Sequence, residues 1–378
     1  AYANGTVLYN KAVINSQGGT QYTDTIKLND YNLYNNNLYL HTKLKFGLTD
    51  DGNSLTIKGE RDFNPTSLVN YHKYTDITYN NFMSDSSPNL RIEMNYSDSS
   101  KSYYEVHKYN TAQNLDTYNS FDDAQNTAHV LVIKDTNASH TSNITSGSSS
   151  HSQIMTTGGA SLNFTGHDGD IIVTNSTESD DTYNVDYINT DMNLFITDKG
   201  GTDDILNLQG MSMSDFENLF LAFNVNKDGT TDDKFTITYG TSVWNTAVYV
   251  LAGKTDLQSN VVVVEAAKQD GKNIGIEHVY GCSSDWSNTT IDTNGFKHPQ
   301  TTKLAEIDME SWYSAVKQDV VNWMSTEANA DWMTTNGLNS TADVFNFYNN
   351  NSAGYEMAQS LINVYENYNA SMYVPKDK

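Results

Sequence analysis

Carboxylates stand in front of short β-type runs at regular intervals in the middle of the chain. Asp170, Asp181, Asp191 and Asp204 precede the runs IIV, TYNV, MNLFI and ILNL, at intervals of 11, 10 and 13 residues. A repeated acidic turn followed by a strand predicts a solenoid-like fold whose turns stack at one edge. Clustered oxygens suit calcium, which takes about six to eight oxygen ligands and would offset the repulsion between the acids. The other interpretation is a series of solvated acidic turns between antiparallel strands.

A second group of oxygen-bearing residues lies in the sequence NVNKDGTTDD at 224–233. Positions 1, 3, 5, 7 and 9 of an EF-hand-like loop would be held by Asn224, Asn226, Asp228, Thr230 and Asp232. Gly229 occupies position 6, but Phe235 stands where an EF-hand has glutamate, and the next segment is typical of a strand. Two interpretations stay open: a calcium loop completed by a ligand from elsewhere, or a polar β-turn around Asp-Gly.

Three segments resemble the repeats of the RTX family, the calcium-binding β-roll proteins with the pattern G-G-x-G-x-D-x-U-x. They are TGHDGDIIV (165–173), ESDDTYNVD (178–186) and DKGGTDDILNLQG (198–210), and NIGIEHVYG (273–281) resembles a segment that follows such rolls. The strong part of the resemblance covers residues 160–285. It departs from the family in its longer spacing and in several replaced turn glycines, so we expect about one to three occupied sites.

The resemblance implies a β-roll, bound calcium and export by the type I route to the outside of a bacterial cell. It places the calcium ligands at Gly166, Asp168, Asp170, Asp180, Asp181, Gly200, Gly201, Asp203 and Asp204.

The elements that must position these residues are mainly strands. Alternating and turn-separated runs predict an N-terminal β domain at 1–135, with β-sandwich-like strands, and a second β region at 160–300. The resemblance implies that this second region is the RTX-like calcium-binding β region. Residues 136–159 are rich in Ser, Thr and Gly, which predicts an exposed loop or linker. Residues 301–378 predict a short α-helical C-terminal region, with Thr302 capping its first helix and a Ser340–Asp343 capping box later on.

Charge and composition exclude several classes of partner. The net charge is −24 with a pI of about 4.5, which argues against nucleic acid and anionic membrane surfaces and suits cations. A single cysteine, Cys282, excludes an intrachain disulfide. No apolar run approaches the roughly 20 residues of a membrane helix. Because the sequence begins at Ala1, we expect a processed product or a fragment.

Catalytic motifs are missing from the sequence. It contains no H-E-x-x-H, no G-x-S-x-G and no P-loop, so we do not expect an enzyme. His140, His151 and His167 could form a transition-metal site. Cys282 lies near His278 in sequence, but a buried structural cysteine is the more common case.

Three functions are compatible with these features. The first is an extracellular calcium-binding structural or adhesive protein of a bacterial surface, of the S-layer, filament or adhesin type, calcium-stabilised and self-associating. The second is a non-catalytic part of a secreted RTX hydrolase. The third is a module that binds surface glycans through aromatics such as those of YNLYNNNLYLH (31–41), although packing on a sheet also explains that pattern.

Overall fold

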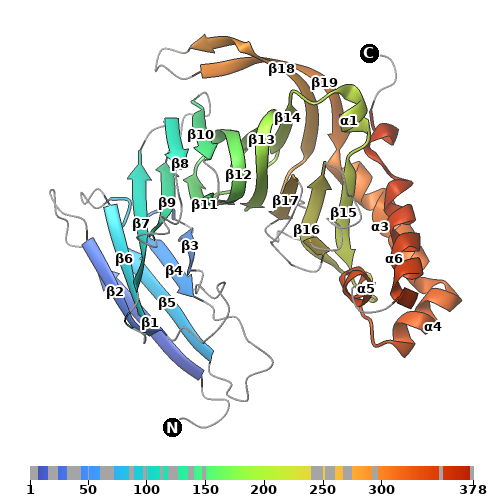
Figure 1. Ribbon diagram of the computed structural model, residues 1–378, viewed down its shortest axis with the longest axis horizontal. Helices are drawn as coiled ribbons and strands as arrows, with labels where there is room; N and C mark the ends of the chain where they lie inside the picture. The colour runs from blue at the N-terminus through green and yellow to red at the C-terminus, as the bar shows by residue number, and fades with distance from the viewer. Residues whose placement is uncertain are drawn as a thin grey trace.

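The protein is mainly β with short helices near its C-terminus. The computed structural model describes residues 7–15, 24–31, 44–49, 51–59, 72–84, 89–96, 99, 101–110, 114–117, 127–134, 140–146, 150–239, 250–251, 260–266, 275–291, 297–348 and 352–374. Figure 1 shows an arched molecule, with the N-terminal strands at one end and the C-terminal helices at the other.

Two sheets face each other at the N-terminal end. The strands are β1 (Val7–Asn15), β2 (Asp24–Tyr31), β3 (Leu44–Leu48), β4 (Leu55–Gly59), β5 (His72–Asn80), β6 (Asn89–Tyr96) and β7 (Lys101–Tyr109). The first sheet has the order β1-β5-β4-β3, and β2, β6 and β7 belong to the large second sheet. One apolar core that includes Leu44, Ile57, Ile92 and Val106 lies between them. The described part of this region is therefore built of strands, in agreement with the mainly β prediction.

The next strands lead into the middle of the large sheet. They are β8 (Asn114–Thr117), β9 (Thr127–Lys134), β10 (Ser142–Ser146) and β11 (Ser150–Thr157). Successive residues of β9 alternate between two cores: Val130 faces the N-terminal core and Leu131 faces the core of the rest of the molecule. In β11, Ile154 and Met155 divide in the same way. A strand buried on both faces explains why β9 is a continuous apolar run.

Residues 136–159 contain β10 and β11 in place of the exposed loop that their composition predicts. Both strands pair in parallel with the following strand, β12 (Ser161–Asn175). Ile144, Ile154 and Met155 are buried, and Thr145, Ser146, Ser150 and Ser152 lie within the two strands. The composition misled because polar side chains stack in register between parallel strands instead of facing a solvated loop.

The middle of the molecule is a stack of parallel strands through which the chain passes repeatedly. β12 is followed by β13 (Thr182–Asp198), β14 (Ile205–Gln209), β17 (Val261–Ala266) and β18 (His278–Ile291). Successive partners Ser142, Leu162, Tyr183 and Leu206 lie 20, 21 and 23 residues apart. We call residues 161–181 the first circuit and residues 182–204 the second circuit. Two of the acidic intervals in the sequence therefore make one circuit, and the acidic turns do not lie between antiparallel strands.

A ladder of asparagine side chains fixes the register of this stack. Asn163 Nδ2 donates to Asn143 Oδ1 at 2.8 Å, Asn184 Nδ2 to Asn163 Oδ1 at 2.9 Å, and Asn207 Nδ2 to Asn184 Oδ1 at 2.7 Å. Each amide donates to one neighbour and accepts from the next, so a shift of one residue would break every bond at once.

The C-terminal part covers the end of the stack. α1 (Met213–Glu217), β15 (Phe220–Val225) and β16 (Thr231–Thr238) precede β17, and β19 (Lys297–Asp308) pairs antiparallel with β18. The helices that follow are α3 (Met309–Ser325), α4 (Glu327–Thr335), α5 (Thr341–Tyr348), α6 (Ser352–Glu366) and the short η1 (Ala370–Met372). Aromatic rings of Trp312 and Tyr365 pack edge-on against Phe223 of β15. None of the helices in the described ranges has the length and apolarity needed to span a membrane.

The first C-terminal helix begins later than the sequence predicts. Residues 301–308 belong to β19, and the cap of α3 is Asp308, whose carboxylate accepts from Ser311 N at 2.8 Å. Thr302 is therefore not the cap, because pairing with β18 overrides local helix propensity. The Ser340–Asp343 capping contact is confirmed, with Asp343 N donating to Ser340 Oγ at 3.1 Å.

Candidate cation site

Three buried carboxylates meet where the two circuits turn. Asp181, Asp198 and Asp204 each offer one oxygen within 4.8 Å of the others, and at most 1% of each residue is exposed. Asp181 directly precedes β13, Asp198 ends β13 and Asp204 directly precedes β14. In the parts of the chain that the structure describes, no other three or more His, Cys, Asp or Glu side chains each offer a ligand atom within 4.8 Å of all the others. We call these residues the carboxylate triad.

The fold places Asp181 and Asp204 in one column with residues of the neighbouring strands. Ala160, Asp181, Asp204 and Glu277 directly precede four residues that pair in register, Ser161, Thr182, Ile205 and His278. The three acidic side chains of this column each accept from the backbone N–H of the preceding residue in the column. Ala160 N donates to Asp181 Oδ1 at 2.6 Å, Asp181 N to Asp204 Oδ1 at 2.8 Å, and Asp204 N to Glu277 Oε2 at 2.8 Å.

A second column holds Asn175 in the first circuit and Asp198 in the second. Thr174 pairs with Thr197, so these two residues are next in register. Asn175 Oδ1 accepts from Thr177 N at 2.8 Å, and Asp198 Oδ1 accepts from Gly200 N at 2.8 Å. Both side chains therefore make the same contact to the residue two positions ahead.

The second polar atom of each side chain has a different partner in the two circuits. In the first circuit, Asn175 Nδ2 donates to Asp181 Oδ2. In the second, Asp198 has no amide hydrogen to give, and its Oδ2 instead accepts from the Tyr183 hydroxyl at 2.5 Å. Asp204 Oδ2 is buried and has no hydrogen-bond partner. A buried carboxylate oxygen without a donor is costly, so this position calls for a proton or a cation.

Burial and mutual repulsion make the triad hard to ionise without a counter-charge. Burial, reinforced by the Asp198 carboxylate, raises the pKa of Asp181 to about 9. Burial raises the pKa of Asp198 to about 6, although the Tyr183 hydrogen bond opposes the rise. Burial and the Asp198 charge also raise the pKa of Asp204. At neutral pH the site therefore holds either protons or a positive ion in exchange for them.

The predicted glycines shape the turn of the second circuit. Gly200 has φ +95°, a conformation that residues with a Cβ rarely adopt. A Cβ on Gly201 would lie 2.8 Å from the carbonyl oxygen of Ser179 and 2.9 Å from Asp180 Oδ1. The glycines let the turns of two successive circuits touch, which is how Asp181 and Asp204 come close.

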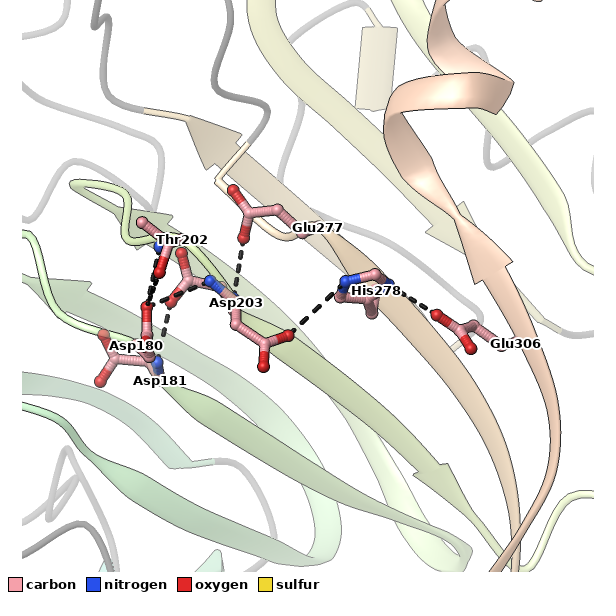
Figure 2. A network of polar contacts seen from close by, with 8 residues as sticks. Asp180, Asp181, Thr202, Asp203, Glu277, His278 and Glu306 are labelled. Carbon is pink, nitrogen blue, oxygen red and sulfur yellow. Dashed lines mark hydrogen bonds and ion pairs between the residues drawn. The ribbon is translucent and has the colours of Figure 1, made fainter.

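Asp180 and Asp203 lie on the outside of the same turns. Asp180 Oδ1 accepts from Thr202 N at 2.8 Å and from Asp203 N at 3.1 Å, and these contacts hold its pKa below the usual value. Asp203 lies 3.5 Å from His278 Nε2, and His278 Nδ1 lies 2.6 Å from Glu306 (Figure 2). Of the acid pairs predicted in these turns, one member of each is buried in the triad and the other is exposed with protein partners.

The first predicted repeat differs from the other two. Gly166, Asp168 and Asp170 lie inside strand β12, where the backbone of Asp170 pairs with Asn193; their side chains fall outside the described residues. Asp191 likewise lies inside β13. Of the four regularly spaced aspartates, only the second and the fourth, Asp181 and Asp204, therefore lie at the edge where the triad forms.

The EF-hand-like loop is a tight turn between β15 and β16 whose polar groups have protein partners. Asn224 Oδ1 accepts from Thr341 Oγ1 at 2.9 Å and from Ala342 N at 2.8 Å, so it faces the start of α5. The Asn226 amide donates to Thr230 Oγ1. Asp228 accepts from the backbone N–H and the hydroxyl of Thr230. Asp232 accepts from the Asn224 amide. These contacts are those of a polar β-turn.

The other residues that the sequence singled out are not part of the triad. Cys282 is buried, its Sγ lies 3.6 Å from Asn207 Oδ1, and burial raises its pKa to about 11, as expected of a structural cysteine. The side chains of His151 and His167 lie outside the described residues, as do residues 32–41 of the aromatic segment.

Sequence reasoning missed Asn175, Asp198 and Glu277. The first two were overlooked because only acids that precede β runs were counted, whereas these residues end a strand. The repeated six-residue spacing, Asn175 to Asp181 and Asp198 to Asp204, was the available signal. Glu277 lies 73 residues from Asp204, and its position in the column depends on how β18 joins the stack.

The chain has no match among protein-family models, curated proteins or solved structures.

Proposed function

We propose that this protein is an extracellular calcium-binding structural or adhesive protein of a bacterial surface, built on a β-solenoid of the β-roll kind. The observation that carries the proposal is Asp204 Oδ2, a buried carboxylate oxygen that has no donor and lies beside two other buried carboxylates. The parallel circuits of 20–23 residues support the solenoid, since turns one circuit apart stack at one edge.

The donors of the triad fit a hard cation. Asp181, Asp198 and Asp204 offer only carboxylate oxygens, which suit calcium, magnesium or manganese better than softer metals. A bound divalent cation would supply the positive charge that the buried acids lack. Calcium is favoured because all three residues lie in segments that resemble RTX repeats, and the resemblance assigns two of them, Asp181 and Asp204, as calcium ligands.

Calcium would act as a structural element of the folded chain. A ligand that binds only the folded state stabilises it by about 2.7 kcal/mol when present at 100 times its dissociation constant. The net charge of −24 further favours folding in the presence of cations. Export by the type I route to a calcium-rich exterior, followed by self-association into a layer, filament or adhesin, completes the proposal.

Thermal unfolding of the full chain in calcium and in chelator tests the cation. Calcium is expected to raise the melting temperature of the wild type. Asp204→Asn should abolish the calcium response, because the variant has a neutral side chain in the triad. Asp203→Asn is the matched control: it removes the same charge from the same turn but from an exposed side chain. Equal melting temperatures of the wild type in calcium and chelator would contradict the proposal.

Self-association needs its own measurement. Light scattering of the full chain during calcium addition is expected to report particles that grow with protein concentration and dissolve in chelator. Scattering that stays at the monomer value while calcium binds would remove the assembly part of the proposal and leave the calcium site.

A further inference from the structure

We infer that the residue ending the long strand of each circuit, Asn175 in the first and Asp198 in the second, decides whether that circuit closes with a hydrogen bond or with a cation. The inference rests on the proposed cation site. It names the residue that determines which circuit binds a cation and how many cations the chain binds.

The two residues occupy equivalent positions in their circuits. They are neighbours in register, both are buried, and both accept from the backbone N–H two positions ahead at 2.8 Å. Each lies six residues before a buried aspartate, Asp181 or Asp204, of the column that begins at Ala160. Each side chain has one further polar atom, and Asp198 has a carboxylate oxygen within 4.8 Å of one of Asp204.

The chemical difference lies in that remaining atom. In Asn175 it is an amide nitrogen, which donates to Asp181 Oδ2 and satisfies it. In Asp198 it is an oxygen, so Asp204 Oδ2 is left without a donor. The first circuit closes as a neutral amide with one carboxylate, and the second presents two carboxylates to one another.

The surroundings of Asp198 are suited to a charged side chain. The Tyr183 hydroxyl donates to Asp198 Oδ2 at 2.5 Å, whereas the residue in register with Tyr183 in the first circuit is Leu162, which has no donor. The second circuit therefore carries a hydrogen-bond donor that the first does not need.

The preceding position in the column shows a third form. Ala160 stands where Asp181 and Asp204 stand and has no side-chain oxygen. Along the stack, Ala160 offers no ligand and Asp181 is hydrogen-bonded by the Asn175 amide. Asp204 and Asp198 form a carboxylate pair that would bind a divalent cation with a preference for oxygen ligands.

Calorimetric titration of the full chain with calcium tests the inference through reciprocal exchanges. Asp198→Asn is expected to lower the number of bound calcium ions by one and to raise the melting temperature in chelator by several degrees. Because the Tyr183 hydroxyl then loses its acceptor, the variant is also made with Tyr183→Phe. Asn175→Asp is expected to add one calcium ion, bound more weakly because Leu162 offers no donor. The double exchange, Asn175→Asp with Asp198→Asn, should restore the wild-type number.

Different results would contradict this inference and the cation proposal on which it rests. If the wild type binds calcium and both exchanges leave the number of ions and the melting temperature in chelator unchanged, the determinant is wrong and the cation proposal stands. If the wild type binds no calcium and gains no stability from it, both fail. Circular dichroism of each variant in calcium verifies that the fold is retained, and Asp203→Asn should behave as wild type.

Discussion

The backbone N–H of Asp204 donates to Glu277 Oε2 at 2.8 Å across 73 residues of sequence. This bond joins the turn that carries the triad to the start of β18 and so to the β18–β19 hairpin. Glu277→Ala would leave a buried N–H without its acceptor, at an expected cost of about 1–3 kcal/mol in the free energy of unfolding. Urea unfolding measures this cost. Glu277→Gln keeps an acceptor and should lose less; equal losses for both variants would show that the bond is not the cause.

The triad predicts an unusual pH dependence for the chelated protein. Burial raises the pKa of Asp198 from the ordinary 3.8 to about 6 and that of Asp181 to about 9, so the folded chain holds protons more tightly than the unfolded chain. Stability from a raised pKa is complete below the unfolded value and is lost as the pH rises through the folded value. The free energy of unfolding should therefore fall between about pH 4 and pH 9, since one pKa unit corresponds to about 1.4 kcal/mol.

Urea midpoints measured in chelator across this range test the sign of the effect. Calcium should restore stability at the alkaline end, because the cation replaces the protons that are lost. A chelated protein that becomes more stable over the same range would show that the triad is ionised and satisfied without a cation.

The close contact between the turns of the two circuits at Gly201 leaves no room for a side chain. Gly201→Ala places a Cβ 2.8 Å from the Ser179 carbonyl oxygen, which is backbone and cannot rotate away. We expect a loss of about 1–3 kcal/mol and weaker calcium binding, because the turns must separate. Gly229→Ala is the comparison: its φ of +80° makes alanine unfavourable there, but no atom lies within 4 Å of the new Cβ. Calcium affinity should fall for Gly201→Ala alone.

The β15–β16 turn should be indifferent to calcium. Asp228→Asn is expected to leave the number of bound ions unchanged, because Asp228 accepts from Thr230 within the turn. Asn224→Ala should instead reduce stability, since its carbonyl oxygen accepts from Thr341 and Ala342 at the start of α5. Asn224→Asp retains that acceptor and should be milder. Loss of one calcium ion in Asp228→Asn would move the site to this turn.

Periodicity and residue type predicted the broad outline, because they report on contacts between residues near in sequence. The abundance of strands, the helical C-terminal region and the Ser340–Asp343 contact follow from such local patterns. Asp181 and Asp204 were identified because each directly precedes a β run. The circuits themselves were harder to foresee, since each contains one long strand and the acidic intervals correspond to about half a circuit.

What the sequence could not supply depends on contacts between distant segments. Asp198 belongs to the site only because the end of β13 meets two turns, and Glu277 only because β18 joins the stack. Thr302 has the residue type of a cap but lies in a strand that β18 holds in place. In each case tertiary pairing decides between locally equal alternatives.

The column of Ala160, Asp181, Asp204 and Glu277 has a direction. The first three N–H groups in it each donate to a carboxylate that comes later in the sequence: Ala160 to Asp181, Asp181 to Asp204 and Asp204 to Glu277. A chain that is synthesised from its N-terminus therefore exposes these donors before their acceptors exist. Each later segment supplies the acceptor for the one before it, so this edge is complete only after the segment that carries Glu277 has been made.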